Sequence, residues 1–158
     1  RIKVGFVLPP YTQSNYALND NEYYVVAEKV TELAQKGEKY GITLEYECGV
    51  PTCAFTDEQL GILWKCGSKL KSGCCSRLDI TPHGEVIYCL PLASVASKMY
   101  NEFANYQEAK EWFERSFAPY RRLGRTVNCA TCPLMNPRQC NGACLAKNLI
   151  GVKNLNLK

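Results

Sequence analysis

The stretch "CCSRLDITPHGEVIYC", from Cys74 to Cys89, decides how the second half of this chain is interpreted. Apolar and polar residues alternate on both sides of a short segment, Pro82–Gly84, whose proline and glycine favour a turn. The apolar members of this alternation are Leu78, Ile80, Val86 and Tyr88. A two-residue period interrupted by turn residues predicts a β-hairpin, here with cysteines at both of its outer ends.

Composition allows a folded core and excludes several classes of protein. The chain has 158 residues, of which 46% are hydrophobic, enough to bury a core without covalent cross-links. The net charge of +4 is spread along the sequence apart from Arg121, Arg122 and Arg125, which favours a solvated surface over a nucleic-acid site. No apolar run reaches the length of a membrane span and no signal peptide is present, so we expect a cytoplasmic protein without a membrane partner.

Cysteine is the unusual residue. The chain has ten, namely Cys48, Cys53, Cys66, Cys74, Cys75, Cys89, Cys129, Cys132, Cys140 and Cys144. Disulfides would imply a secreted, loop-rich framework, whereas the segments between the cysteines have the patterns of ordinary helices and strands. Buried unreactive thiols would explain a few cysteines but not a C-x2-C followed by a C-x3-C. Binding of a metal ion or a cluster explains the pattern best.

The first third of the sequence predicts a βαβ unit. Residues 1–9 and 42–47 have strand patterns, and the intervening segment has apolar residues at helical spacing after a capping Asn19 or Asp20, with Gly37 or Gly41 to end the helix. A βαβ unit implies parallel strands, and two parallel strands alone are rarely stable. We therefore expect residues 1–60 to be the terminal piece of a larger α/β, TIM-like barrel, in a chain that is α+β overall.

Two further helices are expected. Thr56 and Gln59 have the spacing of a capping box at the start of a short helix. Residues 105–123 place apolar side chains on one helical face, and Pro119 should bend or end this helix. The apolar residues of that face are Ala109, Trp112, Phe113 and Phe117. Trp64 and Trp112 are both candidates for the core.

The stretch "CATCPLMNPRQCNGAC", residues 129–144, carries the densest group of thiols. Soft thiolate ligands select zinc, cuprous copper and iron–sulfur clusters, and the C-x2-C spacing is common to zinc and cluster proteins. By themselves these four cysteines would make a zinc site of an interaction module without enzymatic activity. The members of that alternative site are Cys129, Cys132, Cys140 and Cys144.

The two cysteine stretches together resemble the SPASM domain of radical S-adenosylmethionine enzymes. Cys74, Gly84 and Cys89 match the first part of its pattern, in which nine or more residues separate the cysteine from the glycine and four separate the glycine from the next cysteine. Residues 129–144 match the C-x2-C and C-x3-C of the second part, with seven residues between them where the family has five. The resemblance covers residues 66–150 and suggests a boundary between residues 1–60 and an auxiliary-cluster domain at 61–158.

The resemblance implies one or two auxiliary [4Fe–4S] clusters and assigns their ligands. The first cluster would take Cys74, Cys89 and Cys144, with a fourth ligand upstream of the hairpin for which Cys53 is preferred and Cys48 or Cys66 are alternatives. The second cluster would take Cys129, Cys132 and Cys140. Its fourth ligand in the family is a later cysteine, and none follows Cys144 in this sequence.

The resemblance also implies a function. Radical S-adenosylmethionine enzymes with SPASM domains modify peptides or proteins, and the auxiliary clusters transfer electrons or bind substrate. This chain has no C-x3-C-x2-C motif for the catalytic cluster, so it should not cleave S-adenosylmethionine alone. We therefore expect the C-terminal portion of such an enzyme, with the rest of the barrel and a peptide or protein substrate as its partners.

Overall fold

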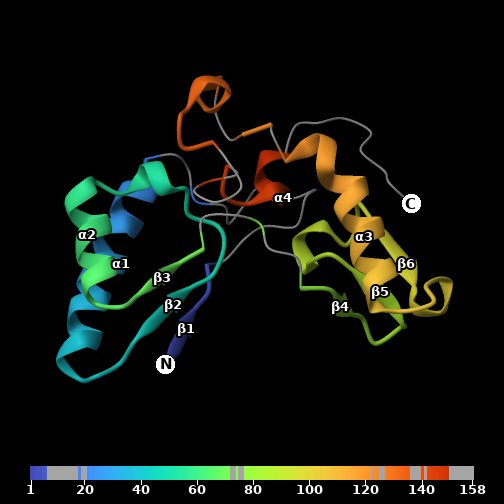
Figure 1. Cartoon of the computed structure of the whole chain (residues 1–158), viewed down its shortest axis with the longest axis horizontal. Helices are drawn as coiled ribbons and strands as arrows, with labels where there is room; N and C mark the ends of the chain where they lie inside the picture. The colour runs from blue at the N-terminus through green and yellow to red at the C-terminus, as the bar shows by residue number, and fades with distance from the viewer. Residues whose placement is uncertain are drawn as a thin grey trace.

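The computed structural model of the chain has two lobes, each with its own small sheet (Figure 1). The structure describes residues 1–6, 18, 21–71, 74, 77–121, 123–124, 127–135, 140 and 142–149. Within these residues the first sheet has three parallel strands and the second has three antiparallel strands. The chain therefore has the mixed α and β content that the sequence predicts.

The predicted βαβ unit forms the first lobe. Strand β1 (Ile2–Val4) pairs in parallel with β2 (Leu44–Tyr46), and helix α1 (Glu22–Lys39) connects them. Of the two glycines that could end α1, Gly41 lies just after it at a φ of 65° and donates its N–H to the carbonyl of Glu38. Asn19 and Asp20, the expected caps, lie outside the described residues.

A third strand that the sequence pattern does not predict completes this sheet. Strand β3 (Lys69–Leu70) pairs in parallel with β2, and helix α2 (Asp57–Lys65) precedes it. The capping box at the start of α2 is confirmed: the Gln59 N–H donates to Thr56 Oγ1 at 3.2 Å and the Thr56 N–H donates to Gln59 Oε1 at 2.9 Å. Residue 60, the expected end of the first segment, lies inside α2, and Leu70 still packs against the core of the first lobe.

One face of α1 and one face of α2 close over the first sheet. The buried residues of this core include Tyr23, Ala27, Val30, Ala34, Leu44, Tyr46 and Leu63. Trp64 lies on the opposite side of α2 with 86% of its surface exposed, so the expectation of a core residue is wrong there. Only one face of a nine-residue helix meets the sheet, and Leu63 rather than Trp64 occupies it.

The second lobe contains the predicted hairpin. Strand β4 (Asp79–Ile80) pairs in antiparallel fashion with β5 (Glu85–Ile87), and Gly84 takes a φ of 82° in the turn between them. Strand β6 (Ser97–Met99) adds to β5 on the other side, which the sequence pattern does not predict. The short turns η2 (Leu90–Leu92) and η3 (Tyr100–Glu102) flank β6.

Helix α3 (Tyr106–Phe117) packs on this second sheet. The side chain of its N-cap residue, Asn105, accepts a hydrogen bond from the Glu108 N–H at 3.0 Å. Ala109, Phe113 and Phe117 are buried, as the helical spacing predicts. The α-helix ends at Phe117, and Pro119 lies in the following turn η4 (Ala118–Tyr120), so the expected helix stop is confirmed.

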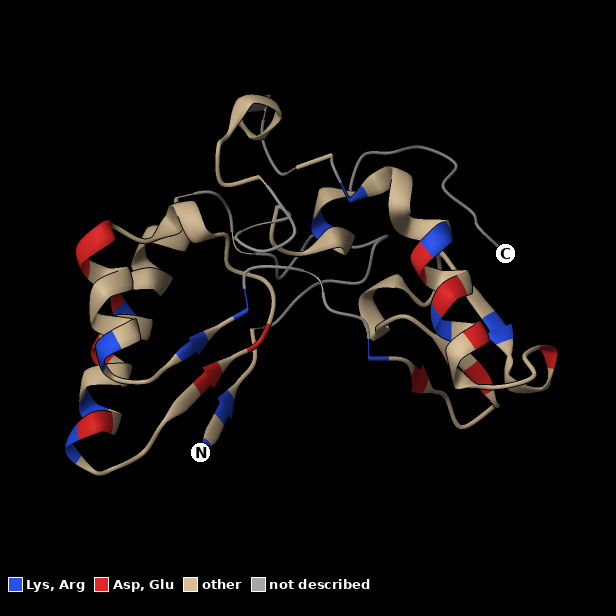
Figure 2. Cartoon of the chain, in the orientation of Figure 1, with Lys and Arg blue, Asp and Glu red and all other residues tan. Residues whose placement is uncertain are grey.

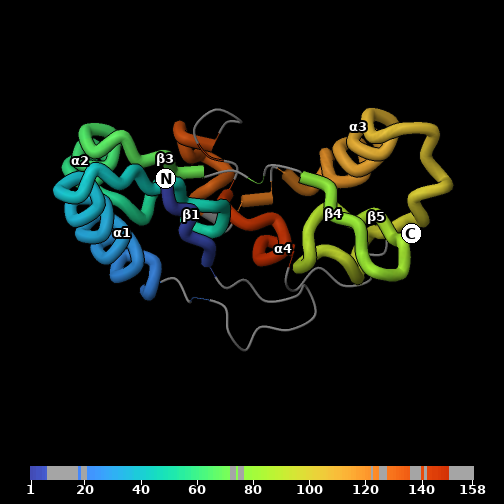
Figure 3. Tube along the Cα trace, turned by 90° about the horizontal axis from the view of Figure 1, so that it is seen from below, coloured from blue at the N-terminus to red at the C-terminus, as the bar shows by residue number. Residues whose placement is uncertain are grey.

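The C-terminal cysteine stretch returns to the space between the lobes. Turn η5 (Val127–Thr131) and the short helix α4 (Leu145–Asn148) carry it, and α4 lies between the two lobes in both views (Figures 1 and 3). Leu145 and Leu149 belong to the second core, while Lys147 Nζ lies 4.9 Å from the centre of the Tyr23 ring on α1. Helix α4 and the residue after it therefore contact both lobes.

Charge is distributed in the same mixed way on both lobes. Lys or Arg and Asp or Glu alternate over α1 and α3, as Figure 2 shows. Arg121, Arg122 and Arg125 are the arginines that lie close together in the sequence, and Arg122 and Arg125 lie outside the described residues. Across the part of the chain that the structure describes, no helix is long and apolar enough to cross a membrane.

Candidate metal centre

Nine of the ten cysteines lie within the described residues, and none of these nine forms a disulfide bond. Cys66, Cys140 and Cys144 are buried, Cys53 is exposed, and the other five are partly buried. Cys75 lies outside the described residues. The electrostatic environment of individual thiols shows how the cysteines group in space.

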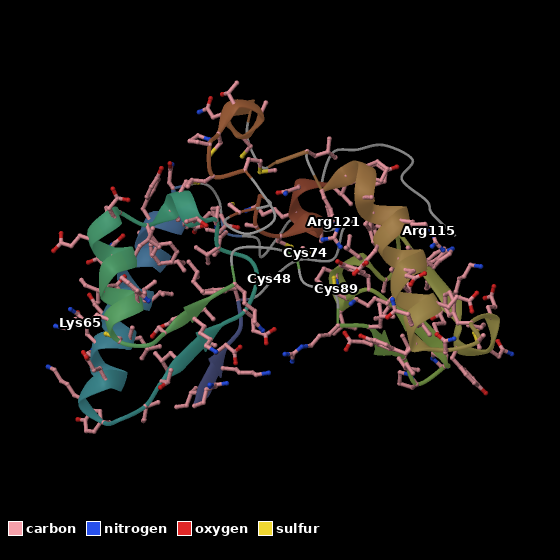
Figure 4. All side chains as sticks on the ribbon, in the orientation of Figure 1. Cys48, Lys65, Cys74, Cys89, Arg115 and Arg121 are labelled. Atoms are coloured by element: carbon pink, nitrogen blue, oxygen red, sulfur yellow. The ribbon has the colours of Figure 1, made fainter. Side chains whose placement is uncertain are left out.

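The first group surrounds Cys89, which follows β5 directly. Burial raises the pKa of the Cys89 thiol, and negative charge on Cys74, Cys144 and Cys48 raises that pKa further. Cys48 lies in the turn after β2, Cys74 lies between β3 and β4, and Cys144 is the N-cap residue of α4. Figure 4 shows Cys48, Cys74 and Cys89 near one another between the lobes. Four segments far apart in the sequence therefore meet at this point.

The second group surrounds Cys53, which lies in the short turn η1 (Thr52–Ala54). Burial raises the pKa of the Cys53 thiol, and negative charge on Cys140, Cys129 and Cys132 raises it further. These are the three cysteines for which the sequence provides no fourth partner. Cys53 thus lies beside these three cysteines, whereas the resemblance made it the preferred fourth ligand of the first cluster.

Cys66 lies apart from both groups. It is buried at the C-terminal end of α2, where its Sγ donates to Glu38 Oε2 on α1 at 3.4 Å. Burial raises the pKa of its thiol, and the neighbouring Glu38 raises it further. Lys65, the preceding residue, lies at the far side of the first lobe from Cys48 in Figure 4. Cys66 packs between two helices, and Cys48 is the upstream cysteine that lies beside Cys89.

A backbone turn separates Cys140 from Cys144. Gly142 and Ala143 between them both take left-handed conformations, with φ values of 76° and 65°. The Gly142 carbonyl accepts a hydrogen bond from Asn148 Nδ2 at 2.9 Å, which joins the turn to α4. Two consecutive left-handed residues reverse the chain sharply, so cysteines four positions apart reach different groups.

Neighbouring backbone and side-chain groups also shape the first group. The Leu92 N–H, in the turn η2 directly after Cys89, forms a hydrogen bond that lowers the pKa of the Cys89 thiol. Arg121 donates through Nη1 to the Cys74 carbonyl at 3.3 Å and through Nη2 to the Tyr88 hydroxyl at 2.6 Å. Tyr88 is 1% exposed and packs on Phe117, with 5.0 Å between the ring centres. The first cysteine group therefore packs directly against the second core.

The four members of the alternative zinc site do not lie in one group. Cys144 interacts with Cys89, whereas Cys129, Cys132 and Cys140 interact with Cys53. Among the residues that the structure describes, no three His, Cys, Asp or Glu side chains are arranged to hold a metal ion. Cys89 and Cys53 each interact electrostatically with the other three cysteines of their group. The residues beside Cys48 and Cys53 in the sequence do not indicate which group either cysteine joins.

Comparison with family models, with curated protein sequences and with solved structures finds no match to this chain. The cysteine groups and the cysteine spacing in the sequence are therefore the observations that bear on function.

Proposed function

We propose that this chain binds two [4Fe–4S] clusters, as the C-terminal portion of a radical S-adenosylmethionine enzyme that modifies a peptide or protein. The first cluster takes Cys48, Cys74, Cys89 and Cys144. The second takes Cys53, Cys129, Cys132 and Cys140. Compared with the ligand sets expected from the sequence, Cys48 replaces Cys53 at the first cluster, and Cys53 becomes the fourth ligand of the second.

One observation carries the proposal. Three cysteines interact electrostatically with Cys89 and three others interact with Cys53, so that eight cysteines form two groups of four. A [4Fe–4S] cluster takes four thiolates. Each thiolate binds a separate iron, so the ligands of a cluster stand farther apart than four sulfurs at about 2.3 Å from one zinc. Cys89 with its three neighbouring cysteines, and Cys53 with its three, each supply the four thiols that this donor requirement asks for.

The chemistry of the thiols also fits a bound cationic group. Burial raises the pKa values of Cys53 and Cys89 most, and negative charge on the neighbouring cysteines raises them further, so the protein alone disfavours four thiolates at either place. A positively charged iron–sulfur core offsets this penalty and holds the ligands deprotonated. Hydrogen bonds to sulfur, such as the one from the Leu92 N–H, tune the reduction potential of such clusters. When bound, the clusters supply one-electron transfer or an electrophilic iron.

Membership of the radical S-adenosylmethionine enzymes rests on two further observations. The cysteine and glycine spacing at 74–89 and 129–144 resembles the SPASM pattern. The parallel order of β1, β2 and β3, with helices between them, is compatible with the end of an α/β barrel. The catalytic cluster, the barrel and the peptide substrate site belong to the rest of that enzyme. A reducing compartment such as the cytoplasm suits a chain whose nine described cysteines form no disulfide bond.

Anaerobic reconstitution with iron and sulfide tests the proposal. We expect a brown protein with about eight irons and about eight sulfides per chain, the content of two [4Fe–4S] clusters. Cys48→Ala and Cys53→Ala should each lose about half of the iron, and the double variant should lose nearly all of it. Cys66→Ala is the matched control, because Cys66 lies in neither group and should keep the full content.

Three results would contradict parts of the proposal. A colourless protein that holds zinc after anaerobic preparation would identify a zinc module. Full iron content in Cys53→Ala would exclude Cys53 as a ligand of the second cluster. Loss of iron in Cys66→Ala, with an unchanged far-UV circular dichroism spectrum, would place Cys66 among the ligands.

A further inference from the structure

Arg121 lies beside the first cysteine group and not on an outer surface. It follows turn η4, and its side chain points back toward Cys74 and Cys89 in Figure 4. The guanidinium group joins the main chain at Cys74 to the side chain of Tyr88, through the two hydrogen bonds of 3.3 Å and 2.6 Å. Tyr88 immediately precedes Cys89, so one arginine holds both ends of the hairpin that carries these two cysteines.

Arg121 forms no ion pair with a carboxylate in the part of the chain that the structure describes. Arg115, on the outer side of α3, differs: its side chain is 69% exposed, and its Nη1 lies 3.7 Å from Glu111 Oε2. Arg121 is partly buried, and its guanidinium carbon lies 5.8 Å from the centre of the Tyr88 ring. A permanent positive charge thus lies next to a group of thiols.

We propose that Arg121 is a positioning residue for the first cluster: it holds Cys74 and Tyr88 in place, and its charge raises the reduction potential of that cluster. This inference rests on the proposed function. The cluster with its four thiolates carries a net negative charge that increases by one when it accepts an electron. A neighbouring positive charge therefore stabilises the reduced form more than the oxidised form.

Arginine is suited to this role because its guanidinium stays protonated and donates in two directions at once. Partial burial limits the screening of its charge by water. The hydrogen bond to the Cys74 carbonyl holds the charge beside the main chain of one of the proposed ligands. The second cluster lies beside Cys53 and the turn η5, where Arg121 makes no hydrogen bond that the structure describes, so Arg121 should act on one cluster only.

The test compares Arg121→Gln and Arg121→Lys with the unaltered full chain after anaerobic reconstitution. Glutamine keeps a hydrogen-bond donor and removes the charge, whereas lysine keeps the charge. Arg115→Gln is the control for removing an arginine elsewhere. Iron content is measured first, and both midpoint potentials are then measured by titration with dithionite, followed by electron paramagnetic resonance.

In Arg121→Gln we expect one midpoint potential to fall and the other to stay unchanged. The expected change is about tenfold in the ratio of reduced to oxidised cluster at a given potential, which equals about 59 mV for one electron. Both midpoint potentials of Arg121→Lys should stay near those of the unaltered chain, and Arg115→Gln should change neither potential. If Arg121→Gln loses the iron of one cluster while Arg121→Lys keeps it, the need for the charge is likewise supported.

Other outcomes overturn the inference. Unchanged potentials in Arg121→Gln with full iron content exclude a role for the charge, while the proposed function still holds. Equal loss of iron in the glutamine and lysine variants shows that Arg121 only supports the fold. An unaltered chain that binds no iron refutes the proposed function and this inference with it.

Discussion

At the scale of the residue, cysteines that are close in the sequence belong to different groups. Cys48 and Cys53 lie on one loop after β2, yet the first interacts with Cys89 and the second with Cys140. Cys140 and Cys144 diverge in the same way across the left-handed turn at Gly142 and Ala143. Backbone conformation between the cysteines therefore decides which site each thiol reaches.

Gly124 provides a test of how tightly the second group is held. It takes a φ of 55°, and a Cβ at this position would overlap Cys129 Cβ and lie 3.1 Å from Cys129 Sγ. Gly124→Ala should therefore lower the iron content of the second cluster and destabilise the fold by about 1–2 kcal/mol, the usual cost of a left-handed alanine, or more. Iron analysis and thermal unfolding measure the two effects.

Gly61, on α2, is the control for this substitution. A Cβ there would meet no other atom within 4 Å. Gly61→Ala should keep the full iron content and raise the free energy of unfolding by up to about 1 kcal/mol, because alanine favours the helix. Normal iron content in Gly124→Ala would show that the second group does not depend on this close contact.

Tyr46 gives a pH-dependent prediction that is independent of any metal. It is fully buried, its hydroxyl donates to the Val30 carbonyl at 2.8 Å, and burial, with a contribution from charge on Cys66, raises its pKa to about 12. The folded state therefore favours the protonated phenol relative to the unfolded state, where the pKa is near 10.0. The contribution of Tyr46 to stability is complete below about pH 10 and decreases as the pH rises towards about 12.

Denaturant unfolding of the wild type and of Tyr46→Phe over this pH range measures the effect. At neutral pH the variant should be less stable by about 1 kcal/mol, because one buried hydrogen bond is lost. The difference between the two proteins should then narrow between about pH 10 and about pH 12. A constant difference over that range would contradict the prediction.

At the scale of the element, helix α2 connects the loop that carries Cys48 and Cys53 to strand β3. It begins four residues after Cys53, and its capping box stabilises that end of the helix. Thr56→Ala removes the hydroxyl that accepts the Gln59 N–H and should destabilise the first lobe by about 1 kcal/mol. Thr56→Ser keeps the hydroxyl and should stay near the wild-type stability, as measured by denaturant unfolding. Equal losses in both variants would show that the cap contributes little.

The hairpin and α3 act together as the support of Cys89. Tyr88, Phe113 and Phe117 form a buried aromatic cluster, in which the ring centres of Tyr88 and Phe113 are 6.1 Å apart. Such a cluster is close-packed and resists movement. The strand end that carries Cys89 is therefore set by packing, whereas Cys129 and Cys132 lie in the short turn η5 and the residue that follows it.

At the scale of the whole molecule, the cysteine groups lie where the two lobes meet. Cys48 and Cys53 lie between strands β2 and β3 of the first sheet, and every other member of the two groups comes after β3. Bound clusters would thus cross-link the lobes, and the free energy of metal binding would become folding free energy. A structural metal can contribute about 10–16 kcal/mol, as much as the whole stability of an ordinary domain.

Removal of the metal should therefore unfold the second half of the chain. After chelation or oxidative loss of the clusters, we expect hydrogen exchange to accelerate in residues after about 66, with a lower far-UV circular dichroism signal and a lower Tm. Residues of the first core, such as Ala27 and Leu44, should keep most of their protection. Unchanged circular dichroism and melting after complete removal would contradict the role of the clusters as cross-links.

The sequence predicted the elements that have a clear local pattern. The helical spacing of α1 and α3, the capping box of α2 and the alternation of the hairpin all depend on residues that are close in the chain. The strands β3 and β6 were missed because they form by pairing with β2 and β5, from which α2 and η2 separate them in the sequence. The exposure of Trp64 was missed because it depends on which face of α2 the sheet covers.

The sequence by itself determined that this protein is unusually rich in cysteine and that a βαβ unit precedes a hairpin and a cysteine-rich end. These properties follow from residue type and short-range spacing. Only the tertiary structure decided that Cys48 lies with Cys89 and Cys53 with Cys140, and that Arg121 lies beside Cys74. Each of these pairs joins segments distant in the sequence, so their proximity depends on how the two cores pack and on the backbone turns between them.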